Sequence, residues 1–336
     1  EQWYETDIGN ELETLLEPLE NADITDQLEI YIYTLEQVNQ IEGGYETDDL
    51  VAPLDGIYAK MGTLLGDSGL SLEQKRKYLD SLIDIYFDLD WSDSELGDAI
   101  IEACSSPEDF SYVIGKLRDC EDDFDAKAEL LAKLYLQSGQ EDAYLEIRRQ
   151  NLNSDLDYLE LAEFYQSRGQ IREAIEIAEN GLNGLAHKAA LYPFLEEQYE
   201  TGGDVQNLQR ILIAQFKEFP SLELYQRLKR VSESAGTWEA ALKRELLAPL
   251  EQSGGYGSEL LLAEIYVADG DYDKALAFSR RSGISVEALS HIAEGISQAY
   301  PEEAIAIYKR LINSYLAVNG RDRYRAAAQL AAGMKQ

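Results

Sequence analysis

Residues 161–181 read LAEFYQSRGQIREAIEIAENG, and residues 262–283 read LAEIYVADGDYDKALAFSRRSG. Superposed at an offset of 101 residues, the two stretches share leucine, alanine, glutamate, tyrosine, glycine and a second alanine at the same positions. Apolar residues recur in both at helical spacing, and a glycine between two amphipathic segments lets the chain turn without a Cβ clash. The stretch therefore predicts a helical hairpin that recurs along the chain.

The turn glycine and the residue four places before it define the repeat. Successive pairs lie 30, 34, 33 and 34 residues apart, and periods near 34 are typical of tetratricopeptide helix-turn-helix repeats. Such hairpins bury their apolar faces only when neighbours stack, so we expect an α-solenoid. The pairs are Tyr135/Gly139, Tyr165/Gly169, Tyr199/Gly203, Ser232/Gly236, in which serine replaces the aromatic residue, and Tyr266/Gly270.

The second helix of each hairpin is expected to carry a small residue, which allows the paired helices to approach closely. Ala174, Ala241 and Ala275 hold this place, whereas Tyr144 and Leu208 replace the small residue in two other repeats. The repeats therefore resemble the tetratricopeptide family in a degenerate form, and residues 161–181 match it best.

Composition and charge divide the chain in two. Only 7 prolines in 336 residues, with many Leu, Ala, Glu and Tyr, favour an all-α protein. The formal charge of −35 is uneven, because residues 1–125 carry 33 acidic and 6 basic side chains and the rest carry 31 and 23. We predict an acidic helical bundle over residues 1–125 and a repeat array over residues 126–336, closed by an Arg-rich capping helix over residues 321–335.

The acidity also restricts the partners. A surface of this sign repels phosphate backbones and anionic lipids, so we expect this region to bind neither nucleic acid directly nor membranes. It attracts basic protein segments, or it serves only to keep the protein dissolved, and composition leaves both open.

Cysteine usage and hydropathy predict a cytoplasmic protein without a cofactor. Cys104 and Cys120 are too few and too isolated for a disulfide framework or a zinc site. The apolar runs are shorter than the ~20 residues needed to span a bilayer, and no leader peptide is recognisable. Low cysteine content is compatible with a reducing compartment.

In the acidic first third, apolar spacing predicts six helices, over residues 7–19, 25–41, 50–65, 71–86, 95–104 and 107–118. Polar loops are expected at residues 42–49 and 88–98, and a joint at residues 120–125. The second loop alternates oxygen-bearing side chains as a calcium loop does. However, Asp93 and Ala99 stand where an EF-hand requires glycine and glutamate, so a helix-capping cluster is expected instead.

The acidic bundle, the stretch SELGDAII at residues 94–101, the degenerate repeats and the ending PEEAIAIYKRLINSYLAVNGRDRYRAAAQLAAGMK at residues 301–335 resemble one known family. They are similar to the C-terminal helical region of prokaryotic SWIM zinc finger proteins. In that family a CxC and CxH zinc module precedes such a region. The present sequence contains neither pattern, so no zinc ligand is carried over. The resemblance implies an accessory, interaction-type role in a DNA-associated protein.

Candidate catalytic residues do not form a recognisable constellation. His187 and His291 read as ordinary helix residues without an adjacent nucleophile. Acidic pairs are too common among 64 acids to be diagnostic. The glycine run at residues 253–258 follows a helix rather than a strand, so it predicts a turn between repeats and not a phosphate-binding loop. We therefore expect a non-catalytic protein.

The repeat groove is the candidate binding site. In proteins of the tetratricopeptide type the first helices line a concave face, where we place the residues two before and one after the aligned position. Most of these are acidic, so we predict a groove for an extended or helical segment that carries Lys or Arg. The alternatives are a solvated surface without a ligand and an acidic N-terminal region that mimics nucleic acid or binds a DNA-binding protein. The predicted groove residues are Lys133, Glu163, Gln166, Glu197, Glu200, Arg230, Glu233 and Glu264.

Overall fold

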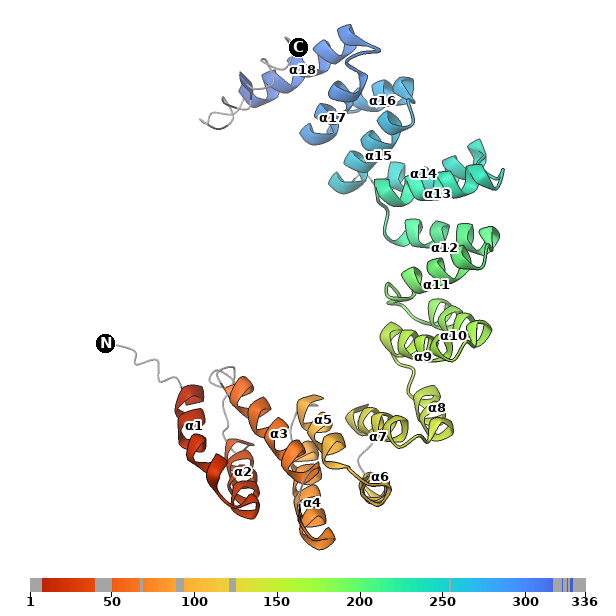
Figure 1. Cartoon of the computed structure of the whole chain (residues 1–336). Coiled ribbons are helices and arrows are strands. Elements are labelled where there is room, and N and C mark those ends of the chain that lie inside the picture. The colour runs from red at the N-terminus through yellow and green to blue at the C-terminus, as the bar shows by residue number, and fades with distance from the viewer. Residues whose placement is uncertain are drawn as a thin grey trace, which may run out of the picture. The chain divides into compact units, whose positions relative to one another are not determined.

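A computed structural model of the protein describes residues 8–39, 50–66, 69–88, 94–120, 125–253 and 255–316, together with Asp322, Arg325, Ala327 and Ala328. Within these residues the regular elements are eighteen α-helices and one short 3-10 helix, η1 (Glu17–Asn21), and no strand is present (Figure 1). The predicted all-α class is confirmed.

Two compact units divide the chain, one within residues 1–153 and the other within residues 154–336. The predicted boundary after residue 125 falls at the first residue of α7 (Asp125–Gln137), the helix that follows α6 (Pro107–Asp119). The first repeat hairpin, formed by α7 and α8 (Glu141–Gln150), therefore groups with the acidic helices. In the sequence the first unit carries 37 acidic and 10 basic side chains, and the second carries 27 and 19.

The helices that apolar spacing predicts in the first third are present. α3 packs against α5, and α2 packs against α3 and α4. Their shared core buries Leu28, Tyr31, Tyr78, Leu79 and Leu96. The bounds are α1 (Ile8–Leu16), α2 (Ile24–Asn39), α3 (Val51–Gly66), α4 (Leu72–Asp88), α5 (Ser94–Ala103) and α6.

Side-chain caps begin two of these helices. Ser71 Oγ accepts a hydrogen bond from the Gln74 backbone N–H at 3.3 Å, and Gln74 Oε1 accepts from the Ser71 N–H at 3.1 Å, so the two residues form a capping box. Ser106 and Asp109 form the same arrangement at α6. Asp109 Oδ2 also accepts from Lys75 Nζ at 2.7 Å, and both side chains are buried. This ion pair ties α4 to α6.

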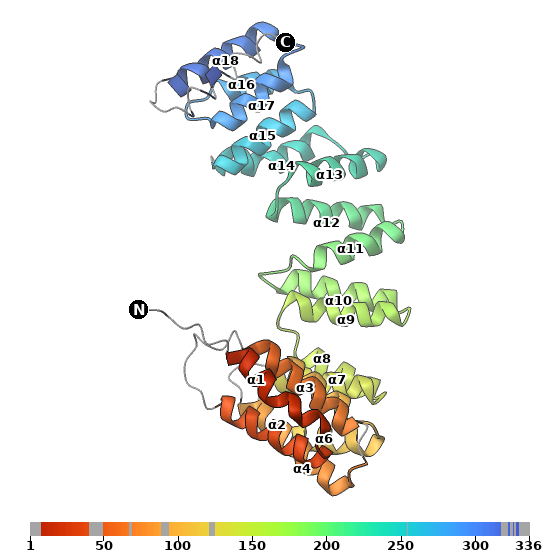
Figure 2. The same ribbon diagram turned by 60° about the vertical axis from the view of Figure 1, so that its left-hand side comes forward.

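The second unit stacks helical hairpins in chain order, as Figures 1 and 2 show. This architecture is that of a tetratricopeptide-like helical repeat, as the sequence predicts. Its helices are α9 (Asp155–Ser167), α10 (Ile171–Gly184), α11 (Leu191–Thr201), α12 (Val205–Glu218), α13 (Leu222–Ser234), α14 (Ala240–Ser253), α15 (Tyr256–Ala268), α16 (Tyr272–Ser279), α17 (Val286–Ile296) and α18 (Pro301–Leu316).

All five predicted turn glycines adopt a positive φ, between 70° and 74°. In each turn the N–H of the residue after the glycine donates to the carbonyl of the aligned residue five places earlier, as from Gln170 to Tyr165 at 2.9 Å and from Asp271 to Tyr266 at 2.9 Å. This bond is the 6→1 closure of a Schellman motif, which places glycine in the left-handed region. The aligned residues, including Ser232, are buried.

Replacing Gly169 by alanine is expected to destabilise the second unit by about 1–2 kcal/mol, because an L-residue at this φ brings Cβ too close to the following carbonyl oxygen. Gly184 in the same hairpin is a matched control, since its φ is not positive and a Cβ there meets nothing within 4 Å. Urea unfolding of Gly169→Ala and Gly184→Ala measures both effects. Equal midpoints for the two variants would contradict this account of the turn.

The first helices of the hairpins, α9, α11, α13, α15 and α17, form a continuous layer that we call the first-helix layer. Direct contacts join α9 to α11, α13 to α15 and α15 to α17, and Arg227 on α13 bridges to α11. Each second helix packs against the first helix that follows it. At one such joint the backbone of Gly181 lies so close to Leu191 and Tyr158 that a Cβ would approach both within 2.7 Å.

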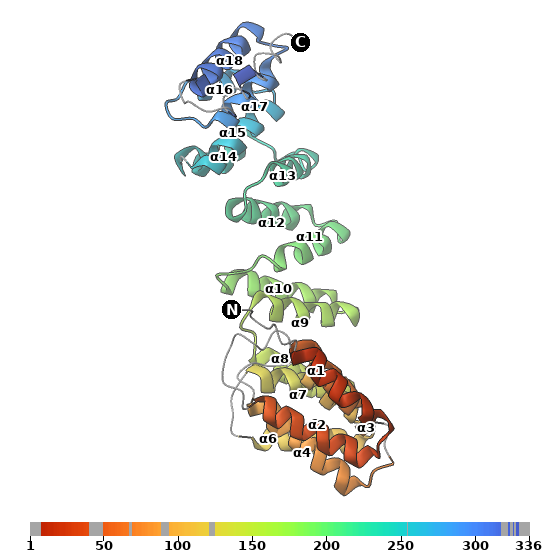
Figure 3. The same ribbon diagram turned by 90° about the vertical axis from the view of Figure 1, so that its left-hand side faces the viewer.

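The fourth hairpin departs from the predicted pattern. Ala174 and Ala275 are fully buried, as expected for close helix contact, but Ala241 is exposed, so its predicted role was wrong. α14 begins four residues after its turn glycine, whereas α10 and α16 begin two residues after theirs, so Ala241 falls in the first turn. α14 packs on α12 and α15 rather than closely on α13, and the two helices diverge in Figure 3.

Several expected segments lie outside the described residues. These are the loop at residues 42–49, residues 89–93 of the capping cluster, residues 121–124 of the joint and most of the capping helix over residues 321–335. Across the described helices, none combines the length and the apolar character needed to cross a membrane.

Candidate functional site

The predicted groove residues all lie on first helices. Lys133 is on α7 in the first unit, whereas the other seven are on α9, α11, α13 and α15 in the second. Glu163, Glu197 and Glu200 are exposed, as are Arg230 and Glu233, and Gln166 and Glu264 are half-buried. The first-helix layer therefore presents seven of the eight residues within one unit.

Neighbouring cations neutralise part of this acidic face. Arg227 Nη2 lies 2.9 Å from Glu200 Oε2, and Lys229 Nζ lies 3.9 Å from Glu233 Oε1. The sequence prediction did not include these cations, because it considered only the residues two before and one after the aligned position of each repeat. Among the predicted acids, Glu163 and Glu197 are the exposed residues that take part in none of these bridges.

A buried carboxylate lies beneath the exposed acids. Glu196 on α11 is only 5% exposed and pairs with the Arg227 guanidinium. Burial raises the pKa of Glu196, although the Arg227 charge and hydrogen bond oppose the shift. Arg227 thus spans two carboxylates, one inside the layer and one on its surface, which fixes α13 against α11.

A second charged cluster, which the sequence did not reveal, joins three helices around Asp269. Its carboxylate accepts from the Tyr225 hydroxyl at 2.6 Å, from Lys229 Nζ at 2.8 Å and from Lys243 Nζ. Lys243 also lies 2.6 Å from Asp271. Burial alone would raise the pKa of Asp269, but the hydrogen bonds from Lys229, Lys243 and Tyr225 outweigh it and hold the pKa below its ordinary value. The Asp269 cluster connects α13 and α14 to the next hairpin.

The core tyrosines repeat one arrangement, in which an apolar ring is buried and the hydroxyl donates to a carboxylate of another helix. Tyr199 donates to Glu179 at 2.7 Å, and Tyr266 donates to Glu251 at 2.6 Å. Burial and the adjacent carboxylate raise the pKa of both phenols. These acids therefore serve packing between helices and not capture of a partner. The signal in the sequence was the abundance of tyrosine, 22 residues, in a chain rich in acids.

The two histidines and Cys104 are further candidates for catalysis or metal binding. His291 lies on α17 as predicted, but His187 lies in the connection between α10 and α11 and not in a helix. Burial, with a smaller effect of Asp109, raises the pKa of the Cys104 thiol to about 12, which keeps it protonated. Over the described ranges, His, Cys, Asp and Glu side chains form no group of three or more that could hold a metal ion.

Comparisons with known proteins return helical-repeat structures at low similarity. No family model and no curated protein matches the chain. The P58(IPK) TPR domain is 13% identical, with 98% of this chain and 99% of that chain covered and a TM-score of 0.26. A monomeric mutant of IFIT1 with Gppp-AAAA is 17% identical over 92% and 83% of the two chains, with a TM-score of 0.26. A circular tandem repeat protein is 16% identical over 98% and 81%, with a TM-score of 0.21. TM-scores this low support no conclusion about partners.

Proposed function

We propose that the chain is a non-catalytic helical-repeat scaffold that binds a protein partner through a basic segment on the first-helix layer. The observation that carries this proposal is the pair of exposed acids on adjacent first helices, Glu163 on α9 and Glu197 on α11. Carboxylates arranged in this way favour Lys or Arg side chains and accelerate their encounter with the surface.

The burial of the remaining charges supports the same assignment. Glu196, Glu179 and Asp269 are engaged with Arg227, Arg210 and Lys243 inside the unit. A partner therefore meets a surface on which Glu163 and Glu197 are available, while the acids that hold the hairpins together are already occupied. This arrangement separates binding from stability, so substitutions at the two exposed acids leave the fold intact.

The test uses a short fluorescein-labelled peptide rich in lysine and arginine, titrated against the full chain. We expect the double substitution Glu163→Lys and Glu197→Lys to weaken binding by about tenfold, because two attractive contacts become repulsive. The matched control reverses Glu173 and Glu176, two exposed acids on α10. This control makes the same change in net charge on a second helix.

Equal losses in the two double variants would contradict the first-helix layer as the binding face. A second candidate function would then be favoured, in which the first unit mimics nucleic acid or holds a DNA-binding protein. Its support is the ratio of 37 acidic to 10 basic side chains in residues 1–153. Under this alternative, a DNA-binding protein competes with DNA for the chain, and the complex weakens steeply with added salt.

The similarity to the C-terminal helical region of prokaryotic SWIM zinc finger proteins accords with an accessory role of this kind. Under this proposal the chain supplies the interaction surface, and a zinc module elsewhere contacts DNA or protein. Interaction through the first-helix layer needs no residue of such a module.

A further inference from the structure

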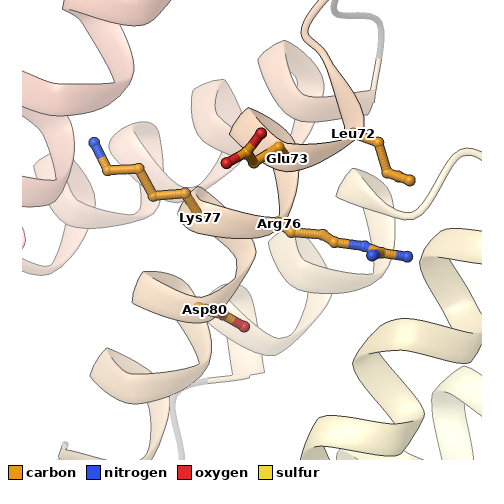
Figure 4. Close-up of a pocket in the computed structure, with 5 residues that line it drawn as sticks. All are labelled: Leu72, Glu73, Arg76, Lys77 and Asp80. Carbon is orange, nitrogen blue, oxygen red and sulfur yellow. The ribbon is translucent and has the colours of Figure 1, made fainter.

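A surface pocket of about 600 Å³ lies along α4 in the first unit, apart from the first-helix layer. Its lining comprises Leu72, Glu73, Arg76, Lys77 and Asp80 (Figure 4). Residues four apart share a helix face, and Figure 4 shows the side chains of Leu72 and Arg76 extending to one side of α4 while Lys77 extends to the other. Leu72 is 49% exposed. The pocket therefore combines an apolar rim with a guanidinium group.

Arg76 is held in place but not neutralised. Its guanidinium carbon lies 4.6 Å from the centroid of the Tyr112 ring on α6, a stacking contact that orients the guanidinium plane. Arg76 Nε is buried and has no hydrogen-bond partner within the described part of the chain. None of the ion pairs found there includes Arg76. The Arg76 side chain as a whole is only half-buried, so a ligand in the pocket can accept from the part of the guanidinium group that remains exposed.

Two other charged groups of the pocket wall, Asp80 and Lys77, already have partners. Asp80 accepts from the Tyr112 hydroxyl at 2.7 Å and lies 3.1 Å from Lys116 Nζ. Lys77 Nζ lies 3.3 Å from Glu29 on α2. Of the two cations that line the pocket, Arg76 is thus the one left without an acid. This is notable in a unit that contains 37 acidic side chains.

We propose that this pocket binds a carboxylate attached to a small apolar group. The carboxylate accepts from Arg76 in the planar geometry that suits a guanidinium fork, and the apolar group lies against Leu72. A singly charged ligand is favoured over phosphate, because Glu73 and the acidity of the unit repel a dianion more strongly. Two sources supply this chemistry, a free small organic acid and the C-terminus of a protein chain that ends in an apolar residue.

Proton–nitrogen NMR of the full chain tests the proposal, because the Arg76 Nε–H gives a side-chain signal that Arg76→Lys removes and so identifies. Hexanoate is the probe for a free acid, and a short acetylated peptide that ends in leucine with a free carboxylate is the probe for a chain terminus. We expect the Nε–H signal to shift and saturate with at least one of them. Hexanamide and the same peptide with an amidated end should leave it unmoved, as should inorganic phosphate at matched ionic strength.

Variants separate recognition from net charge and from folding. Arg76→Gln and Arg76→Lys should weaken binding of the responding probe by about tenfold or more, since each loses the fork. Arg118→Gln removes the same charge from an exposed site on α6 and should leave the affinity within about twofold. Backbone signals of core residues report whether each variant is folded. Absence of any saturable shift with both acids, or equal shifts with the neutral amides, would overturn the proposal.

Discussion

Replacing Asp269 by alanine should destabilise the second unit by about 3–5 kcal/mol, the cost of removing one partner from a buried charged group. The Asp269 side chain is 6% exposed, and the substitution leaves the Tyr225 hydroxyl without its acceptor and Lys229 with only its longer contact to the exposed Glu233, at 3.9 Å. Lys243 keeps Asp271 but loses its more buried partner. The effect should extend over α13, α14 and the turn before α16.

Hydrogen exchange measures this prediction with residue resolution, which suits a stack of hairpins that need not unfold in one step. We expect faster exchange in α13, α14 and α15 and little change in the first unit. Asp273→Ala provides the control, because Asp273 is an exposed acid two residues beyond Asp271. It should cost less than about 0.5 kcal/mol. If the backbone amides of α13, α14 and α15 exchanged equally slowly in Asp269→Ala and Asp273→Ala, the structural role of the Asp269 cluster would be contradicted.

The cost of Asp269→Ala should also depend on pH. The pKa of Asp269 is lower in the folded protein than in the unfolded chain, where it is about 3.9. The ionised carboxylate therefore contributes its full stabilisation when the pH is above the pKa of the unfolded chain. This stabilisation is lost as the pH falls through the lower pKa of the folded protein. The difference in free energy of unfolding between the wild type and Asp269→Ala should be constant from about pH 5 to 7 and should shrink below about pH 4.

In the first unit, Lys75→Met should cost about 3–5 kcal/mol for the same reason. The methionine preserves the apolar stem but leaves Asp109, 4% exposed, without its cation. Burial would raise the pKa of Asp109, yet the hydrogen bonds from Lys75 and Ser106 hold it below its ordinary value, so the carboxylate is charged at neutral pH. The Ser106–Asp109 capping box remains in place, so the loss comprises the ion pair and the hydrogen bond from Lys75 Nζ to Ser105 Oγ.

Lys77→Met is the matched control for this prediction. Lys77 is two residues away on α4, but its bridge to Glu29 is exposed on both sides, and such pairs are worth about 0–1 kcal/mol. Urea unfolding monitored by circular dichroism compares the two variants, and Cys104 labelling adds a local probe of the core beside the pair. A midpoint for Lys75→Met as high as that for Lys77→Met would show that the buried pair contributes nothing to stability.

The turns were predictable from sequence because their requirement is local. A positive φ after a helix restricts the position to glycine, so Gly139, Gly169, Gly203, Gly236 and Gly270 mark the hairpins regardless of what surrounds them. The prediction for Ala241 was wrong because it assumed an earlier start of α14. The helix begins only at Ala240, so Ala241 does not lie at the position where the helices would pack closely. A small residue indicates close packing only when its helix has the expected register.

The pairing of charged residues was less predictable. Aligning equivalent positions of the repeats does not show which cation lies beside each acid. Glu200 reads as a free groove acid, yet Arg227 reaches it from the next first helix. Asp269 reads as an ordinary turn residue, and only the fold brings Lys229 and Lys243 to it from two other helices. The repeat pattern therefore placed the predicted groove residues on first helices, while the unpaired charges among them depend on contacts between hairpins.

The polar links between hairpins also bear on how the second unit responds to mechanical load. The bridge between Lys217 and Glu245 is exposed on both sides and rearranges readily in water, whereas Asp269, at the centre of its cluster, is 6% exposed. We therefore expect stiffness along the stack to be uneven, with the joint between α13 and α15 among the stiffer ones. A partner that bends the unit should flex a joint held by exposed bridges more readily than this one.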